Sequence, residues 1–303
     1  MCIQQFTPAG AAATIPGVKK QPVQTEPPAR PAVAAPPPIR LVAIDLDGTL
    51  LNDSKQVTDQ TIKALAVLPW IGVKMVIATA RPPRSVRHIY QQLNLDTYQI
   101  NYNGALIWDE IGQRPIFHQP MRGSLVRQII GHARDAYADL LVSCEVMDRW
   151  YTDRFYETYT TETGRMFRPD VICDVDETCK LDITKLMFLG HPELMDIIEQ
   201  MFSGPWHEHV TVVRADRDLI QIMDRRVSKA IALQTVAAAY DIPMDQVMAI
   251  GDAPNDVGML QAAGVAIAMD NAHDRCKQVA HWVAPSNNDH GVCAALARYG
   301  LCE

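Results

Sequence analysis

Residues 41–50 read LVAIDLDGTL, an apolar run that ends with two carboxylates two positions apart, Asp45 and Asp47. An apolar run without polar alternation is typical of a parallel strand buried on both faces. Open α/β sheets bind ligands just beyond the carboxyl ends of their strands, and residues i and i+2 of a strand point the same way. We therefore expect one of these acids to attack a shared ligand while the other moves a proton. The simpler alternative is an ordinary Asp-Gly turn at a strand end.

A second apolar run, residues 73–79, also ends in polar groups. Thr79 and Ala80 precede Arg81 and a proline that suits the first turn of a helix. The Thr79 hydroxyl and the backbone N–H groups that follow it form a predicted anion site at the start of that helix.

Two further segments carry charges that need an explanation. Lys229 opens an Ala-rich helical stretch, where the helix dipole disfavours a cation, so we expect this lysine to serve another purpose. Residues 247–251 form a strand-like run that leads to Asp252 and Asp256, with Asn255 between them. Oxygen ligands of this kind suit a hard divalent cation.

These four motifs, in this order, resemble those of the haloacid dehalogenase-like phosphohydrolases, in particular the Cof-like subgroup. The resemblance covers about residues 40–300. It implies an α/β fold: a Rossmann-like, doubly wound parallel sheet with a C2-type α+β cap inserted between the second and third motifs. It implies a phosphatase that uses Mg²⁺ and an aspartyl-phosphate intermediate. One departure is Thr79-Ala80-Arg81, where the family commonly has Thr-Gly-Arg; because alanine is small, we expect activity to survive.

The resemblance also implies a role for each motif residue. Asp45 is implied to be the nucleophile, and Asp47 the acid that protonates the leaving group and later activates water. The implied phosphate-binding residues are Thr79, Ala80, Lys229 and Asn255, and the implied Mg²⁺ ligands are Asp45, the backbone carbonyl of Asp47, Asp252 and Asp256. Attack of a carboxylate on a phosphate dianion requires compensating positive charge, which Mg²⁺ and Lys229 would supply. Asp47 must begin protonated, and neighbouring carboxylates can raise one pKa of a pair.

Composition sets limits on the partners. With 303 residues, 48% of them hydrophobic, the chain suits a soluble globular protein with a substantial core. A formal net charge of −7 argues against nucleic acid and anionic membranes as partners, and no apolar run is long enough to span a bilayer. The expected partner is a small phosphorylated metabolite, and the expected assembly is a monomer or homodimer. Seven scattered cysteines indicate reduced thiols and a cytoplasmic location.

Alternating strand and helix patterns predict how the chain is divided. Residues 1–39 are rich in proline and alanine, which predicts a disordered tail. If this tail is a transit peptide instead, the location is an organelle such as a plastid. The remaining predicted segments are the first part of the core (40–120), the α+β cap (121–216) and the second part of the core (217–303).

A cap over the reaction centre should determine which substrate is accepted. Its polar candidates for substrate contact are Glu145, Arg149, Arg154, Arg165, Arg168 and Lys185, each of which is more commonly a solvated surface residue. The sequence names no particular substrate: a sugar phosphate, a polyol phosphate and a phosphorylated cofactor all fit. A phosphomutase of similar fold and a non-enzymatic binding or regulatory protein on the same scaffold are the alternative functions.

Overall fold

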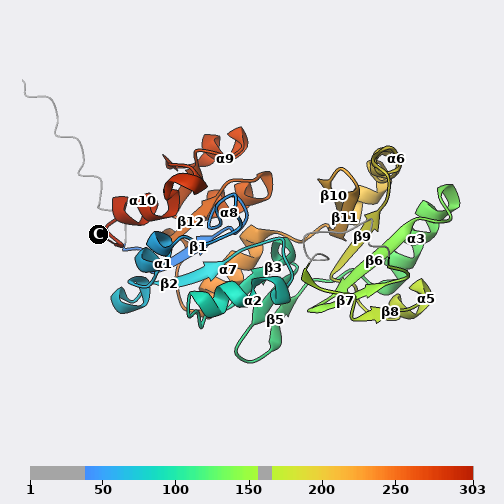
Figure 1. Cartoon of the computed structure of the whole chain (residues 1–303), viewed down its shortest axis with the longest axis horizontal. Coiled ribbons are helices and arrows are strands. Elements are labelled where there is room, and N and C mark those ends of the chain that lie inside the picture. The colour runs from blue at the N-terminus through green and yellow to red at the C-terminus, as the bar shows by residue number, and fades with distance from the viewer. Residues whose placement is uncertain (1–37, 156–165, 303) are drawn as a thin grey trace, which may run out of the picture. The chain divides into compact units, whose positions relative to one another are not determined.

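The computed structural model describes residues 38–155 and 166–302 (Figure 1). The predicted tail, residues 1–39, lies outside this part of the chain except for its last two residues. The central sheet has five parallel strands in the spatial order β14 (Trp282–Ala284), β13 (Val265–Met269), β12 (Val247–Gly251), β1 (Leu41–Ile44) and β2 (Lys74–Ile77).

Strand β1 lies inside this sheet, between β12 and β2. All four of its residues are completely buried, because neighbouring strands flank it and side chains pack on both of its faces. This environment explains why the LVAI run contains no polar alternation. The predicted α/β class with a parallel core sheet is confirmed.

Helices alternate with the strands of the central sheet along the chain. They are α1 (Asp59–Leu65), α2 (Pro83–Gln92), α7 (Lys229–Ala239), α8 (Val257–Ala262), α9 (Asp274–Val279) and α10 (Gly291–Arg298). Helix α7 begins where the Ser228 hydroxyl accepts a hydrogen bond from the N–H of Ala230, a common N-cap contact. Within the described ranges, no helix combines the length and the apolar character needed to cross a membrane.

A three-stranded antiparallel sheet follows α2, with strands β3 (Gln99–Asn101), β4 (Leu106–Asp109) and β5 (Arg114–His118). The Asn103-Gly104 turn joins the first two strands. Asn103 has a left-handed backbone (φ 57°), and Gly104 lies against the backbone carbonyl of Ser228, where a Cβ atom would collide. Glycine is therefore needed at this position so that the turn can approach the start of α7.

The cap contains a six-stranded sheet in the order β10 (Val210–Asp216), β11 (Leu219–Asp224), β9 (Lys185–Leu189), β6 (Leu141–Val146), β7 (Arg149–Thr152) and β8 (Val171–Ile172). Its helices are α3 (Gly123–Ala136), α5 (Val175–Thr178) and α6 (Pro192–Phe202). Alternate strand residues pack with α3 and α6 in a second hydrophobic cluster, which includes Leu186, Phe188 and Ile220. The residues between them face the opposite side of the sheet. Below, we call that side the open face.

One strand differs from its predicted place. The sequence analysis assigns the chain from residue 217 to the core, whereas β11 pairs antiparallel with β9 and β10 in the cap sheet. The sequence of an apolar run of this length indicates a strand but not which strands it pairs with. The tight connection from β10 brings β11 back beside β10. The boundaries of the four predicted segments, taken as a set, remain a prediction.

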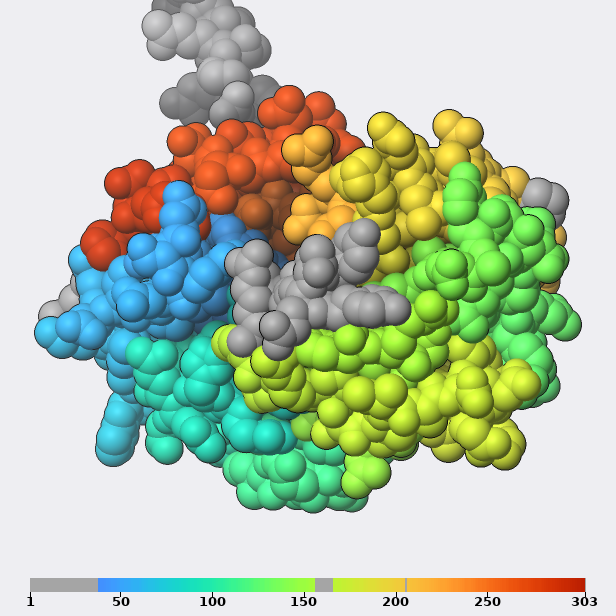
Figure 2. Space-filling model, turned by 45° about the vertical axis from the view of Figure 1, so that its right-hand side comes forward, coloured from blue at the N-terminus to red at the C-terminus, as the bar shows by residue number. Residues whose placement is uncertain are grey.

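The cap contacts the core through side chains that the described residues show directly. Arg84 and Arg87 of α2 form ion pairs with Asp148, and Arg84 also pairs with the buried carboxylate of Glu145. Figure 2 shows the adjoining surfaces of the teal core segment and the green cap segment. These contacts place the open face near the carboxyl edge of the central sheet.

Candidate active site

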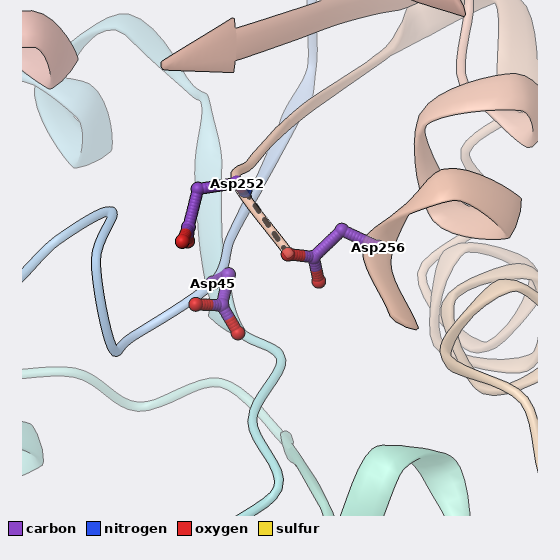
Figure 3. Close-up of side chains that lie close together, drawn as sticks. All are labelled: Asp45, Asp252 and Asp256. Carbon is purple, nitrogen blue, oxygen red and sulfur yellow. Dashed lines mark hydrogen bonds between the residues drawn. The ribbon is translucent and has the colours of Figure 1, made fainter. Parts of the chain in front are cut away.

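Three aspartates meet at the carboxyl ends of two neighbouring parallel strands. Asp45 directly follows β1 and Asp252 directly follows β12, while Asp256 closes a short 3₁₀ turn after Asp252. Figure 3 shows their carboxylates converging, and one oxygen of each lies within 4.8 Å of the others. The topology explains the cluster, because β1 and β12 run parallel side by side and end at the same edge.

Lys229 provides the cation inside this cluster. Its side chain is completely buried, and Nζ donates to Asp45 Oδ1 at 2.5 Å and to Asp256 Oδ1 at 2.6 Å. The charges of Asp256 and Asp45 raise the pKa of Lys229 despite its burial, so the amine stays protonated. This contact accounts for a lysine in the first turn of α7, where the helix dipole opposes a cation.

Backbone groups and a hydroxyl hold the other carboxylates in place. Asp256 Oδ2 accepts from the N–H groups of Asp252 and Ala253, at 3.1 and 3.0 Å. The Thr49 hydroxyl donates to Asp252 Oδ1 at 2.6 Å. Gly48 has a left-handed backbone (φ 85°), and a Cβ atom there would collide with the Asp252 carboxylate. The Asp-Gly turn after β1 is therefore part of the site as well as a chain reversal.

The cluster carries an excess of negative charge. Burial, together with the charge of Asp256, raises the pKa of Asp45 well above its usual value, against the opposing effect of Lys229. Burial also raises the pKa of Asp252 to about 6. Three carboxylates with one ammonium form a buried, oxygen-rich group that fits a divalent cation such as Mg²⁺.

The Asp47 side chain lies outside this cluster. Its carboxylate, about a third exposed, pairs with the Arg81 guanidinium through Oδ1 at 2.5 Å and Oδ2 at 2.7 Å, and with Lys55 Nζ at 2.8 Å. Burial opposes the shift, but the Arg81 and then the Lys55 contacts lower the pKa of Asp47. The two acids are therefore electrostatically unequal: the pKa of Asp45 is raised, and the pKa of Asp47 is lowered.

The predicted phosphate-binding residues lie around the same edge of the sheet. Thr79 is buried at the end of the β2 segment, and its Oγ1 accepts from the N–H of Arg81 at 3.2 Å. Asn255 is exposed and donates through Nδ2 to Asn103 Oδ1 at 2.8 Å. Ala80 and Asn255 line the pocket described next, as does Lys229.

A pocket of about 910 Å³ opens over the edge that carries these residues. Its core side includes Asp47, Ala80 and Lys229, and its cap side includes Trp150, Lys185 and Met187 from the open face. Its volume suits a small organic ligand. Of the predicted cap contacts, Glu145 and Lys185 line the pocket, and Arg165 lies outside the described residues.

Sequence reasoning missed three contributors to the site: Thr49, Lys55 and Asn103. Thr49 belongs to the Asp-x-Asp-Gly-Thr motif, so its place in that motif was a usable signal. Lys55 gives no sequence signal, because it reaches Asp47 only through the fold of the loop after β1. The Arg81 guanidinium pairs with the carboxylate of Asp47.

Comparisons with known proteins agree with this fold. Residues 42–296 match the family model of haloacid dehalogenase-like hydrolases. The 5-amino-6-(5-phospho-D-ribitylamino)uracil phosphatase YitU of Bacillus subtilis is 29% identical over 279 residues, covering 86% of this chain and 97% of the relative. Two Bacteroides thetaiotaomicron structures are also similar. A haloacid dehalogenase-like hydrolase has TM-score 0.77 and 21% identity, covering 86% of this chain and 99% of its own. The phosphatase BT1666 has TM-score 0.72 and 26% identity, covering 87% and 96%.

The fold and the carboxylate cluster thus define a hydrolase of the phosphoryl-transfer type. The chain belongs to the haloacid dehalogenase-like hydrolase family. It is a phosphatase of this family.

Proposed function

We propose that the chain is a Mg²⁺-dependent phosphohydrolase that cleaves a phosphomonoester through an aspartyl phosphate on Asp45. The observation that carries this proposal is the buried contact of Lys229 with Asp45 and Asp256 at the edge where three aspartates converge. A nucleophilic carboxylate needs neighbouring positive charge to approach a phosphate dianion. Lys229 supplies one such charge and holds the Asp45 side chain in place.

In the first half of the proposed reaction, a carboxylate oxygen of Asp45 attacks phosphorus while the phosphorus–oxygen bond to the leaving group breaks. The leaving oxygen takes the proton of Asp47. In the second half, water gives a proton to Asp47 and attacks phosphorus. The bond between phosphorus and Asp45 then breaks, which releases phosphate and restores both acids. Thr79 and the N–H groups that follow it are proposed to orient the phosphoryl oxygens.

Asp47 must gain a proton before the first half of the reaction, although Arg81 and Lys55 lower its pKa in the present arrangement. A phosphoryl dianion beside Asp47 competes for these two cations. We therefore expect substrate binding to draw Arg81 and Lys55 away from the carboxylate and so to raise the pKa of Asp47. This exchange would couple protonation of the acid to the arrival of substrate.

The carboxylates of Asp45, Asp252 and Asp256, with the backbone carbonyl of Asp47, are the proposed holders of Mg²⁺. When bound, Mg²⁺ neutralises charge on the phosphoryl oxygens and on the cluster.

We propose a cytoplasmic location and a monomer or homodimer. We also propose that the protein binds neither nucleic acid nor membranes, which the net charge of −7 supports.

The test is phosphate release by the purified full chain from sugar phosphates, polyol phosphates, phosphorylated cofactors and p-nitrophenyl phosphate. We expect release with Mg²⁺, none with EDTA, and recovery when excess Mg²⁺ is added. Equal release in EDTA would refute the role of the metal. No release from any compound would refute the phosphohydrolase. Isomerisation of a sugar phosphate that depends on a bisphosphate activator, without release of phosphate, would instead favour the phosphomutase.

Replacing the proposed acid separates proton transfer from metal binding. We expect Asp47→Asn to slow turnover by at least about 10²-fold, because the leaving oxygen loses its proton donor. Its side chain lies outside the carboxylate cluster, so Mg²⁺ should raise the melting temperature of this variant as much as that of the wild type.

The exposed neighbour provides the control: Asp53→Asn should keep full activity. Turnover of Asp47→Asn above a tenth of the wild-type rate would count against the acid role. Loss of the Mg²⁺ effect on melting would show instead that the variant has disturbed the metal site.

A further inference from the structure

Lys185 is a buried cation that the catalytic cluster does not use. It begins β9 in the cap and is 5% exposed, yet it lines the pocket over the aspartates. Along β9, Leu186 and Phe188 pack into the helix-side cluster, so Lys185 and Met187 face the other way, on the open face. Its direction toward the pocket therefore follows from the strand period.

The nearest carboxylate is already occupied. Glu145 pairs with Lys185 in the strand register, but its Oε1 accepts from Arg84 at 2.7 Å and its Oε2 accepts from the Tyr102 hydroxyl at 3.2 Å. Lys185 Nζ lies over the Tyr102 ring, 5.0 Å from its centroid. Among the residues the structure describes, Lys185 makes no hydrogen bond or ion pair.

Burial of this kind is unfavourable for an ammonium without a contacting acceptor. Desolvation lowers the pKa of Lys185 to about 8, although the charge of Glu145 opposes the shift. A ligand oxygen that accepts from Nζ would remove this penalty. The same pocket is also lined by the apolar side chains of Trp150, Met187 and Met223.

We propose that Lys185 is a specificity-determining residue, which donates to an acceptor oxygen on the leaving group of the substrate. The preferred substrate is then a phosphomonoester whose leaving group carries a carboxylate or carbonyl oxygen. The inference rests on the proposed phosphatase site, since it concerns the part of the same substrate beyond the phosphoryl group.

The test compares wild type with Lys185→Met on phenyl phosphates that carry a carboxylate, an acetyl or an ethyl group at the para position. A second series places the same groups behind a three-carbon spacer to cover a longer reach. For each compound, the kcat/KM of the variant is divided by the kcat/KM of the wild type. This ratio cancels differences in leaving-group reactivity between compounds. We expect this ratio to fall by about 10- to 100-fold for the acceptor-bearing compounds of at least one series, and to stay near unity for ethyl.

If the kcat/KM ratio falls for the carboxylate compound alone, the group that Lys185 recognises is anionic. If the ratio falls for both the carboxylate and the acetyl compound, Lys185 recognises any oxygen acceptor. An equal fall for all three groups would show a structural role and overturn the inference, as would no fall in either series. The matched control is Lys180→Met, which removes an exposed cap lysine that pairs with Glu177. Methionine replaces an unpaired buried charge with an apolar chain of similar length, so folding should survive. If Lys185→Met does not fold, Lys185→Gln is the second variant.

Binding separates this inference from the proposed function. Calorimetry on the Asp45→Asn background gives the Kd of the same compounds without turnover. If wild type hydrolyses none of them but Lys185→Met weakens binding of the acceptor compounds alone, then the phosphatase proposal fails and the role of Lys185 stands. If binding is also unchanged, the role of Lys185 is refuted.

Discussion

Asp45→Asn should lower phosphate release by roughly 10⁴-fold or more, because the reaction loses its nucleophile. Asparagine has nearly the shape of aspartate, and Lys229 keeps its contact with Asp256, so the fold should persist. The measurement is single-turnover phosphate release together with the melting temperature. Rapid quenching and mass analysis of the peptide that spans residue 45 should find a phosphorylated peptide in the wild type and none in the variant.

The control for this variant is Asp59→Asn at the exposed start of α1, which should retain activity. Turnover of Asp45→Asn above one per cent of the wild-type rate would exclude Asp45 as the nucleophile. A phosphorylated peptide from elsewhere in the chain would identify a different acceptor.

Lys229→Met should destabilise the metal-free protein by about 3–5 kcal/mol, the range measured when one partner of a buried ion pair is removed. The substitution leaves Asp45, Asp252 and Asp256 facing one another without the single cation that contacts two of them. Turnover should fall as well, since that cation is proposed to offset the phosphoryl charge. Urea unfolding with EDTA measures the free energy of unfolding directly.

Adding Mg²⁺ should recover part of this stability, by about 2.7 kcal/mol at a concentration one hundred times the Kd. Lys63→Met, which removes an exposed lysine from the last turn of α1, should cost no more than about 1 kcal/mol. Wild-type stability of Lys229→Met in EDTA would show that the ammonium does not balance the cluster. Absence of any Mg²⁺ effect would argue against the carboxylates as metal holders.

Local sequence pattern determined the central sheet and the position of its reaction edge. The uninterrupted LVAI run, the run that ends at Thr79 and the run that ends at Gly251 could each be recognised alone, because burial on both faces leaves a distinctive composition. Parallel strands end at one edge, so Asp45 and Asp252 could be expected to meet there. Lys229 was conspicuous because the dipole of α7 gives it no local reason to be present.

Only the tertiary structure decided which partners these groups take. Arg81 and Lys55 pair with Asp47, Glu145 takes Arg84 and Tyr102, and β11 joins the cap sheet. Most of these contacts join residues that are far apart in the chain, and sequence period reports which face is buried but not what lies against it. The pKa shifts follow those partners: burial beside Asp256 raises the pKa of Asp45, and Arg81 and Lys55 lower the pKa of Asp47 against the effect of burial. Sequence therefore determined the motifs and the family, and packing decided which partner each charged group takes and which lysine faces the pocket.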